Sequence, residues 1–460
     1  MIAKARGTVF LLLLVTLCYN VRGQCEGEDK SETGNAKNDT LTAILEVPDE
    51  EESNEFKKQR FVPRCGDDFL KHVLVGRWVH NSAFLRGGKK KKKAFMIDIS
   101  KKKRQLDKDM KSVWRLRGIP EDPWKSTTNC GYYRLRESNV RRPPIGTWCD
   151  PKGPRPCCNN KLLGYCVSAQ AGSCSCTNCA DVRKLQHAEL MTWLPYSYMC
   201  KWKQFTAPEA CDVIEHSPVK KLYIVGDSYM QSMYIGLLMI LTGKPITGFW
   251  KKGVISTEQY VKCANYGLNY FKDCRAMIET MDDMKYRDSL CGDGRNVTFK
   301  AEFRKYYHSR FGPQFRKLIK RLAGKRGTYV VVGIGFHIRM EIDLAIRHFM
   351  APAIREVSLH YKHKQHIPQS RRWPRFLFSL PMDYGLLKPT RHLKEQYHTK
   401  QTKFERGMRS YCRRNSIRVL DFTPLTKNVH TFDGVHYGIG VNNMKNQIFL
   451  NYLATLKQYK

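Results

Sequence analysis

The feature that most constrains the fold is an alternation of short apolar runs with longer stretches of helical character, beginning at residue 219. The apolar runs have the length of buried strands and comprise Leu222–Val225, Tyr329–Ile334, Arg375–Leu380 and Ile417–Phe422. The helical stretches comprise Tyr229–Leu241, Phe315–Leu322 and Phe404–Arg414. Strands that alternate with helices form parallel sheets with helices on both faces, so residues 219–460 are predicted to form an α/β domain.

The first 23 residues have the features of a signal peptide. Lys4 and Arg6 precede an apolar run from Val9 to Cys18, and small residues suited to a signal peptidase follow it. An uncleaved signal anchor in a Golgi membrane is the alternative, but this run is shorter than the ~20 residues that span a bilayer. We therefore expect a protein that is secreted or resides in the Golgi or ER lumen, with no transmembrane span.

Two further regions precede the α/β domain. Residues 24–59 are acidic and poor in aromatic residues, so they are predicted to be a disordered segment. This segment is expected to act as a solubilising linker, although folding back over a basic surface is an alternative. Residues 60–218 form a basic, cysteine-rich N-terminal region.

The cysteines indicate disulfides. Removal of Cys18 with the signal peptide leaves sixteen of the seventeen cysteines, an even number in an oxidising compartment. The spacing of Cys176 and Cys179 would suit zinc, but no histidine lies among the clustered cysteines, so no metal or other cofactor is expected. Asn38 and Asn296 stand in N-glycosylation triplets consistent with the secretory route.

Lysine-rich runs mark the start of the cysteine-rich region. Lys89–Lys93 follow two glycines and lie between the apolar pieces Val73–Leu85 and Ala94–Ile99, so they are predicted to form a hairpin tip or exposed loop. The formal net charge of +38 attracts polyanions. For a secreted chain these are glycosaminoglycans, sialylated glycans or anionic lipids, and nucleic acid is an unlikely partner; a merely solvated basic surface is the alternative.

A candidate nucleophile follows the first apolar run of the α/β domain. Ser228, in Val225-Gly226-Asp227-Ser228, stands where a strand ends and a helix begins. Its hydroxyl is therefore predicted at the carboxyl edge of the sheet, and its backbone N–H at the positive end of a helix, which stabilises an oxyanion. The same residues also suit an ordinary turn with a helix cap.

A candidate base lies near the C-terminus. Asp433 and His436 are three residues apart, so the carboxylate is predicted to orient the imidazole while the imidazole takes the serine proton. They follow the last apolar run, where a base returning to the same sheet edge would lie. If the assignment holds, Ser228 Oγ and a ring nitrogen of His436 lie about 3 Å apart. Asp421 is a less favoured orienting group.

Both motifs resemble those of SGNH (GDSL-like) esterases. Ile224–Ser228 and Asp433–Tyr437 are most similar to the PC-esterase branch, which includes the neurexophilin and PC-esterase proteins and the trichome-birefringence-like proteins. This resemblance implies an SGNH-like parallel sheet preceded by a disulfide-rich region, with Ser228, His436 and Asp433 as the catalytic triad.

The middle of the domain departs from the family pattern. Where a Gly-x-Asn-Asp block is expected, Val332 begins a string that contains Gly335 and His337. Together with Gly226 and Asp227, these residues are candidates for an oxyanion or substrate site; simple bonding of His337 to neighbouring backbone is the alternative.

The function implied by the resemblance is an O-acyl, expected O-acetyl, esterase or acyltransferase that acts on glycans through an acyl-serine intermediate. A transferase would also need an acyl donor. The alternative is a catalytically inactive secreted protein that binds glycans or a receptor through an esterase scaffold.

Overall fold

A computed structural model describes residues 61–117 except 67 and 82–88, and residues 185–456 except 245–247, 252–273, 275, 279, 282–289, 293–294, 296, 384, 386–395, 397 and 433. Between these ranges it describes four strands of two residues each. They pair as β2 (Tyr132–Tyr133) with β3 (Ile145–Gly146), and β4 (Cys157–Cys158) with β5 (Ala180–Asp181). Residues 1–60, which include Asn38, and Asn296 lie outside the described residues.

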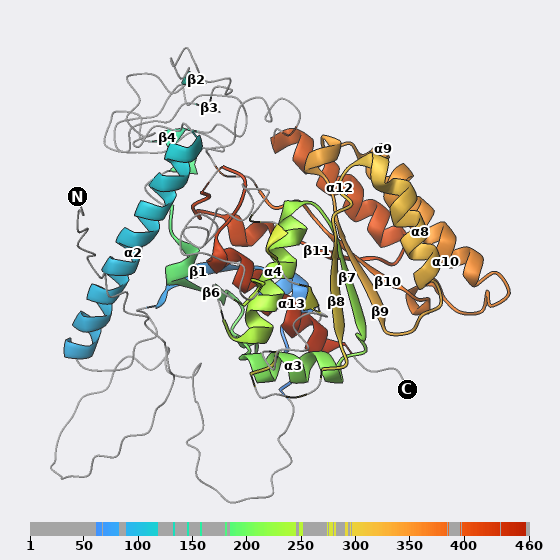
Figure 1. The fold of residues 1–460 in the computed structure, drawn as a ribbon, viewed down its shortest axis with the longest axis horizontal. Helices are drawn as coiled ribbons and strands as arrows, with labels where there is room; N and C mark the ends of the chain where they lie inside the picture. Colours follow the sequence, from blue (N-terminus) through green and yellow to red (C-terminus); the bar gives the residue numbers. More distant parts are fainter. Residues whose placement is uncertain are drawn as a thin grey trace, which may run out of the picture. The chain divides into compact units, whose positions relative to one another are not determined.

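The core is a five-stranded parallel sheet in the order β8-β7-β9-β10-β11 (Figure 1). Its strands are β7 (Lys221–Gly226), β8 (Lys300–Arg304), β9 (Thr328–Gly333), β10 (Arg375–Ser379) and β11 (Arg418–Leu420). The four predicted strands are confirmed. The edge strand β8 was not predicted, because it is short, half-exposed and contains three charged residues.

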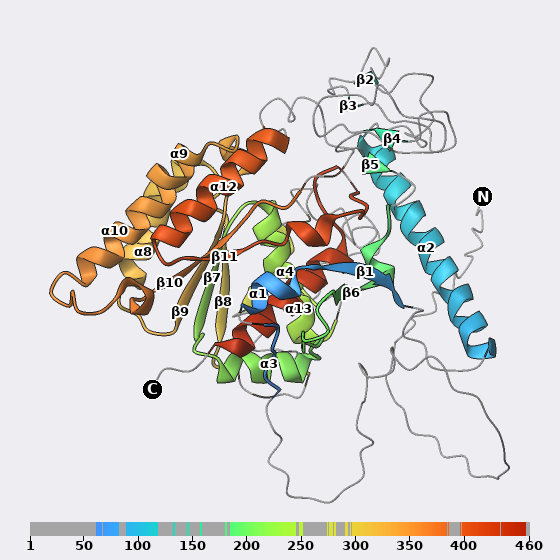
Figure 2. The ribbon, with the colours of Figure 1, turned by 180° about the vertical axis from the view of Figure 1, so that it is seen from behind.

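Helices cover both faces of this sheet, as predicted. Figures 1 and 2 show α4 (Ser228–Thr242) and α13 (Ile439–Thr455) on one face, and α8 (Gly312–Leu322), α10 (Ala351–His360) and α12 (His398–Arg414) on the other. Shorter segments complete the second face or its connections: η6 (Ser309–Phe311), η7 (Phe336–Ile338), α9 (Ile342–Ala345), the π-helical η8 (Ile346–Met350) and η9 (Gln369–Arg371). Helix α4 is buried nearly all round because the sheet, α3 and α13 enclose it.

The part of the N-terminal region next to the sheet packs on the α13 face. It contains α1 (Phe69–Val73), the antiparallel strands β1 (Gly76–His80) and β6 (Met191–Pro195), η4 (Ala188–Leu190) and α3 (Ala207–His216). Helix α3 contacts both α4 and α13. The Trp78 indole donates a hydrogen bond to the carbonyl of Leu425, in η10 (Thr423–Thr426), at 2.9 Å. Residues on either side of position 218 therefore share one core.

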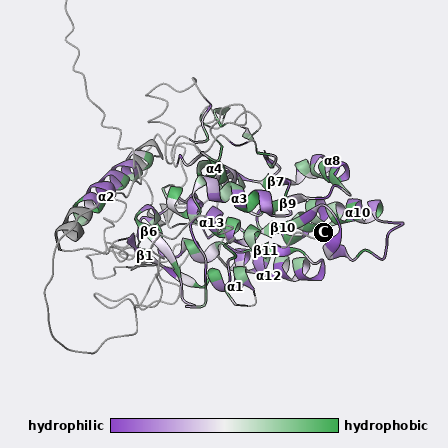
Figure 3. Ribbon diagram, turned by 90° about the horizontal axis from the view of Figure 1, so that it is seen from below, coloured by the Kyte–Doolittle hydropathy of each residue, from purple (hydrophilic) through white to green (hydrophobic). Residues whose placement is uncertain are grey.

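The lysine runs do not form a hairpin. Lys89–Lys93 and Ala94–Ile99 both lie within α2 (Lys89–Arg117), so the predicted loop is wrong. Residues 89–117 contain no glycine or proline, and lysine favours helix. An Asp98–Lys102 ion pair also joins successive turns. Figure 3 shows most of the described part of α2 as hydrophilic, whereas the central strands are hydrophobic.

Disulfides are present, as predicted. Cys65 pairs with Cys200, and Cys211 of α3 pairs with Cys291, which precedes β8. Cys412 of α12 is buried and free, and burial raises the pKa of its thiol to about 12. Disulfides agree weakly with an extracellular or lumenal location. Among the described helices, none is long and apolar enough to cross a membrane.

Candidate active site

Ser228 lies at the topological switch point of the sheet. Strand β7 ends at Gly226, Asp227 caps the following helix, and Ser228 is the first residue of α4. From β7 the chain continues to β8 on one side and then returns to β9 on the other side. In doubly wound sheets the carboxyl ends of strands at such a point border the ligand crevice. The half-exposed Ser228 therefore occupies the position that this fold class uses for ligands.

The structure brings His436 to Ser228. The His436 Nε2 atom lies 2.7 Å from Ser228 Oγ, within the range of a nucleophile and its base. His436 is half-buried in the loop that precedes α13. The hydroxyl of Tyr229 holds this loop by donating a 2.6 Å hydrogen bond to the carbonyl of Val435. The predicted contact between Ser228 and His436 is therefore present.

The orienting carboxylate stays a prediction, because Asp433 lies outside the described residues. The less favoured candidate, Asp421, has other partners: it forms an ion pair with Arg409 and accepts the backbone N–H of Thr423 at 3.1 Å.

Two buried ionisable groups contact the backbone of Tyr229, the residue that follows Ser228. Asp227 is 5% exposed, and its Oδ1 accepts the backbone N–H of Tyr229 at 3.0 Å. Lys445 of α13 is 2% exposed, and its Nζ donates to the Tyr229 carbonyl at 3.3 Å. The carboxylate of Asp227 is therefore engaged in capping α4.

Burial shifts the pKa values of Asp227 and Lys445 so that the neutral form of each is favoured. It raises the pKa of Asp227 to about 6, although the Tyr229 N–H and the charges of His436 and Lys445 act in the opposite direction. It lowers the pKa of Lys445 to about 7, although the Asp227 charge opposes this. The sequence analysis missed Lys445. Its signal was its position as the single charged residue of the segment Ile439–Thr455.

Lys445 is expected to make stability depend on pH. Between the folded pKa of Lys445, about 7, and the ordinary lysine pKa of 10.5, the unfolded chain holds a proton that the folded chain has lost, so stability rises with pH. Lys445→Met removes this rise. From about pH 7.5 to about pH 9.5, the free energy of unfolding of the wild type should increase by about 2–3 kcal/mol relative to Lys445→Met, measured by urea denaturation. A difference independent of pH would contradict the assignment.

The loop after β9 contains the remaining predicted site residues. Gly335 is buried, and a Cβ there would lie 2.6 Å from Pro381 Cγ, so a larger residue would collide with the loop that follows β10. His337 is exposed, and its ring lies 4.6 Å from the ring of Tyr307, which follows β8. Because β7 lies between β8 and β9, the Tyr307–His337 contact spans the strand that ends just before Ser228.

The ring of Tyr229 contacts both the segment after β9 and the loop that contains His436. It stacks on Phe336 with centroids 5.0 Å apart and lies 5.7 Å from the ring of His436. Sequence analysis did not identify Tyr229 or Tyr307, because neither belongs to a recognisable motif. The glycine that would supply a second oxyanion donor was not identifiable from the sequence. No group of His, Cys, Asp or Glu suited to a metal ion occurs among the described residues.

Comparisons with protein-family models, with curated proteins and with solved structures find no match to the chain. The similarity to PC-esterases therefore rests on the two motifs around Ser228 and His436.

Proposed function

We propose that the chain is a secretory-pathway O-acyl esterase or acyltransferase of the PC-esterase branch of the SGNH superfamily, which acts on glycans through an acyl-serine intermediate. The observation that carries this proposal is the 2.7 Å contact between Ser228 Oγ and His436 Nε2, at the switch point of a parallel sheet. Acetyl is the expected acyl group.

The reaction begins when Ser228 Oγ attacks the ester carbonyl carbon and His436 Nε2 accepts the hydroxyl proton. The tetrahedral oxyanion is stabilised by backbone N–H groups at the positive end of α4, which include that of Ser228. When the C–O bond of the ester breaks, His436 returns the proton to the departing sugar oxygen, and the acyl group stays on Ser228. Water or a second sugar hydroxyl then attacks this acyl-serine, which gives hydrolysis or transfer.

The surroundings of Ser228 support a glycan as substrate. Tyr307 and His337 stand beside the end of β7, and the Nζ of Lys305 lies 5.6 Å from the centre of the Tyr307 ring. An aromatic ring offers a flat apolar face to a sugar ring, while lysine and histidine supply polar contacts to its hydroxyls. The signal-peptide pattern favours the secretory route, where glycans are abundant.

The net charge of +38 favours a second candidate, a secreted glycan-binding protein without catalysis. Such a protein would keep the basic surface and need no reactive serine. Reactivity of Ser228 therefore distinguishes the two functions.

The test measures the reactivity of purified protein toward a chromogenic acetyl ester and a fluorophosphonate probe. We expect ester turnover and a covalent adduct that mass spectrometry locates on the peptide containing Ser228. Acyl transfer is measured in parallel, as the mass increase of an added oligosaccharide acceptor in the presence of the ester. If the wild type shows no hydrolysis, no transfer and no labelling, the enzymatic proposal fails and the binding function is favoured.

A further inference from the structure

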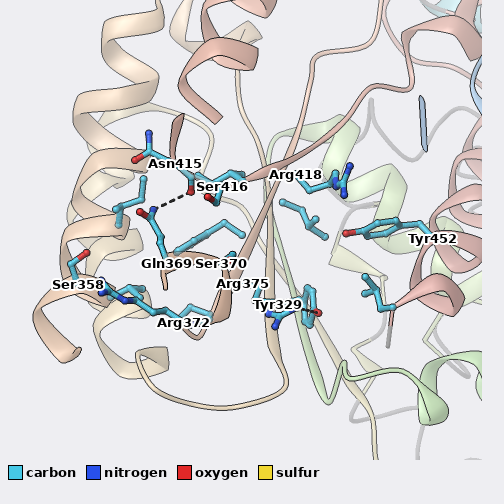
Figure 4. Close-up of a pocket in the computed structure, with 17 residues that line it drawn as sticks. Tyr329, Ser358, Gln369, Ser370, Arg372, Arg375, Asn415, Ser416, Arg418 and Tyr452 are labelled. Carbon is cyan, nitrogen blue, oxygen red and sulfur yellow. Dashed lines mark hydrogen bonds between the residues drawn. The ribbon is translucent and has the colours of Figure 1, made fainter. Parts of the chain in front are cut away.

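A pocket lies at the edge of the sheet opposite Ser228, where β9, β10 and β11 begin (Figure 4). Tyr329, Arg375 and Arg418 stand at or next to the first residues of these strands. The walls come from both faces of the sheet, with Val357 of α10 on one side and Tyr452 of α13 on the other. A strand of five or six residues is about 17–20 Å long, so this pocket is remote from the acyl-transfer site.

The pocket is strongly basic. Arg372, Arg375 and Arg418 line it, and none of its described lining residues is acidic. Two of these guanidinium groups have fixed orientations: Arg372 Nε donates to the Ile367 carbonyl at 2.9 Å, and Arg375 lies 4.7 Å from the ring centre of Trp373. Arg418 forms an ion pair with Asp68, outside the pocket lining, at 2.6 Å. Arg372 and Arg375 therefore give the pocket a positive field, whereas the Asp68 carboxylate partly offsets the charge of Arg418.

Neutral hydrogen-bonding groups accompany the arginines. Burial raises the pKa of Tyr452 to about 12, although Arg418 and Arg375 oppose this, so its phenol keeps its proton at neutral pH. Ser370 and Ser416 are exposed at the mouth of the pocket. Figure 4 shows these serines on one side and Arg418 with Tyr452 on the other. Guanidinium forks combined with hydroxyl donors are the groups that recognise sulfate and carboxylate oxygens.

We infer that this pocket binds the sulfate or carboxylate groups of an acidic polysaccharide. A polymer is favoured over a small anion because the pocket reaches both faces of the sheet and belongs to a chain with a net charge of +38. An acidic polysaccharide is the abundant polyanion of the secretory lumen and cell surface, which is the location that the signal-peptide pattern favours. This site is independent of the acyl chemistry, so it remains whether or not Ser228 reacts.

The test measures the affinity of the full chain for a heparin-derived octasaccharide by calorimetry. We expect the Arg372→Gln/Arg375→Gln variant to bind at least about tenfold more weakly, because it loses charge-assisted hydrogen bonds. Because Arg375 is partly buried, its replacement could disturb folding, so a second variant changes an exposed residue instead. Ser370→Glu, which adds a negative charge at the exposed mouth, should weaken binding to a similar degree.

Two control variants distinguish binding at the pocket from general attraction to the basic surface. Arg326→Gln/Arg355→Gln removes two exposed arginines that do not line the pocket and should change the affinity less than about threefold. Lys101→Gln/Arg104→Gln tests the exposed basic face of α2. The inference is overturned if the pocket variants bind like the wild type, or if the control variants lose as much affinity as the pocket variants.

Discussion

Replacement of Ser228 by alanine is expected to lower kcat/KM for hydrolysis of a short-chain acyl ester by at least about 10³-fold. The variant loses the oxygen that we propose forms the acyl bond, and it leaves His436 Nε2 without the hydroxyl that lies 2.7 Å away. His436→Ala should lower kcat/KM by a similar factor, because the remaining hydroxyl has no base. The double variant should be hardly worse than either single variant, since the two side chains act as a unit.

Ser232 provides a matched control one turn further along α4. Its hydroxyl donates to the Ser228 carbonyl at 2.9 Å, so Ser232→Ala removes this local hydrogen bond and no reacting group. This variant should keep its rate within about threefold of the wild type, because such a bond contributes only about 1 kcal/mol. The rates are compared by steady-state kinetics on variants with matching circular dichroism spectra. A Ser228→Ala variant as active as Ser232→Ala would exclude Ser228 as the nucleophile.

Gly226→Ala is expected to lower the free energy of unfolding by about 2–5 kcal/mol and to slow ester hydrolysis as well. Gly226 has φ +152°, and a Cβ there would lie 2.0 Å from the carbonyl oxygen of Gly333 and 2.6 Å from Met230 Cγ. Gly226 and Gly333 are partners in the pairing of β7 with β9. An alanine must therefore separate these strands at the point where Ser228 is placed.

A glycine at the other end of α4 is the control. Gly243 also has a positive φ, of 64°, but a Cβ there would meet its nearest neighbour, Ala207 Cβ, at 3.5 Å. Gly243→Ala should therefore cost only about 1–2 kcal/mol, from the left-handed backbone, and leave ester hydrolysis unchanged. The loss of unfolding free energy in each variant is measured by urea denaturation. Equal losses of unfolding free energy in the two variants would show that the close approach of β7 and β9 does not exclude a side chain at residue 226.

Much of the α/β domain was predictable because its signals are local. Strands β7 and β9 are continuous apolar runs, and α4 follows β7 after a short turn, so apolar content and length identify them. The α2 helix was missed for an equally local reason: two preceding glycines and a run of like charges suggested a loop, whereas helix propensity and side-chain pairs along residues 89–117 stabilise a helix. Strand β8 was missed because half-exposed edge strands lack an apolar run.

The sequence by itself determined the local positions of the site residues: Ser228 at a strand-to-helix junction, and His436 after the last strand. Only the tertiary structure decided that these residues, 208 positions apart, lie within 2.7 Å of each other. It also decided that Lys445 lies buried near Asp227, and that three arginines meet at the opposite sheet edge. The physical reason is that such contacts depend on strand order and helix packing, which are set by burial of the whole core rather than by the preferences of neighbouring residues.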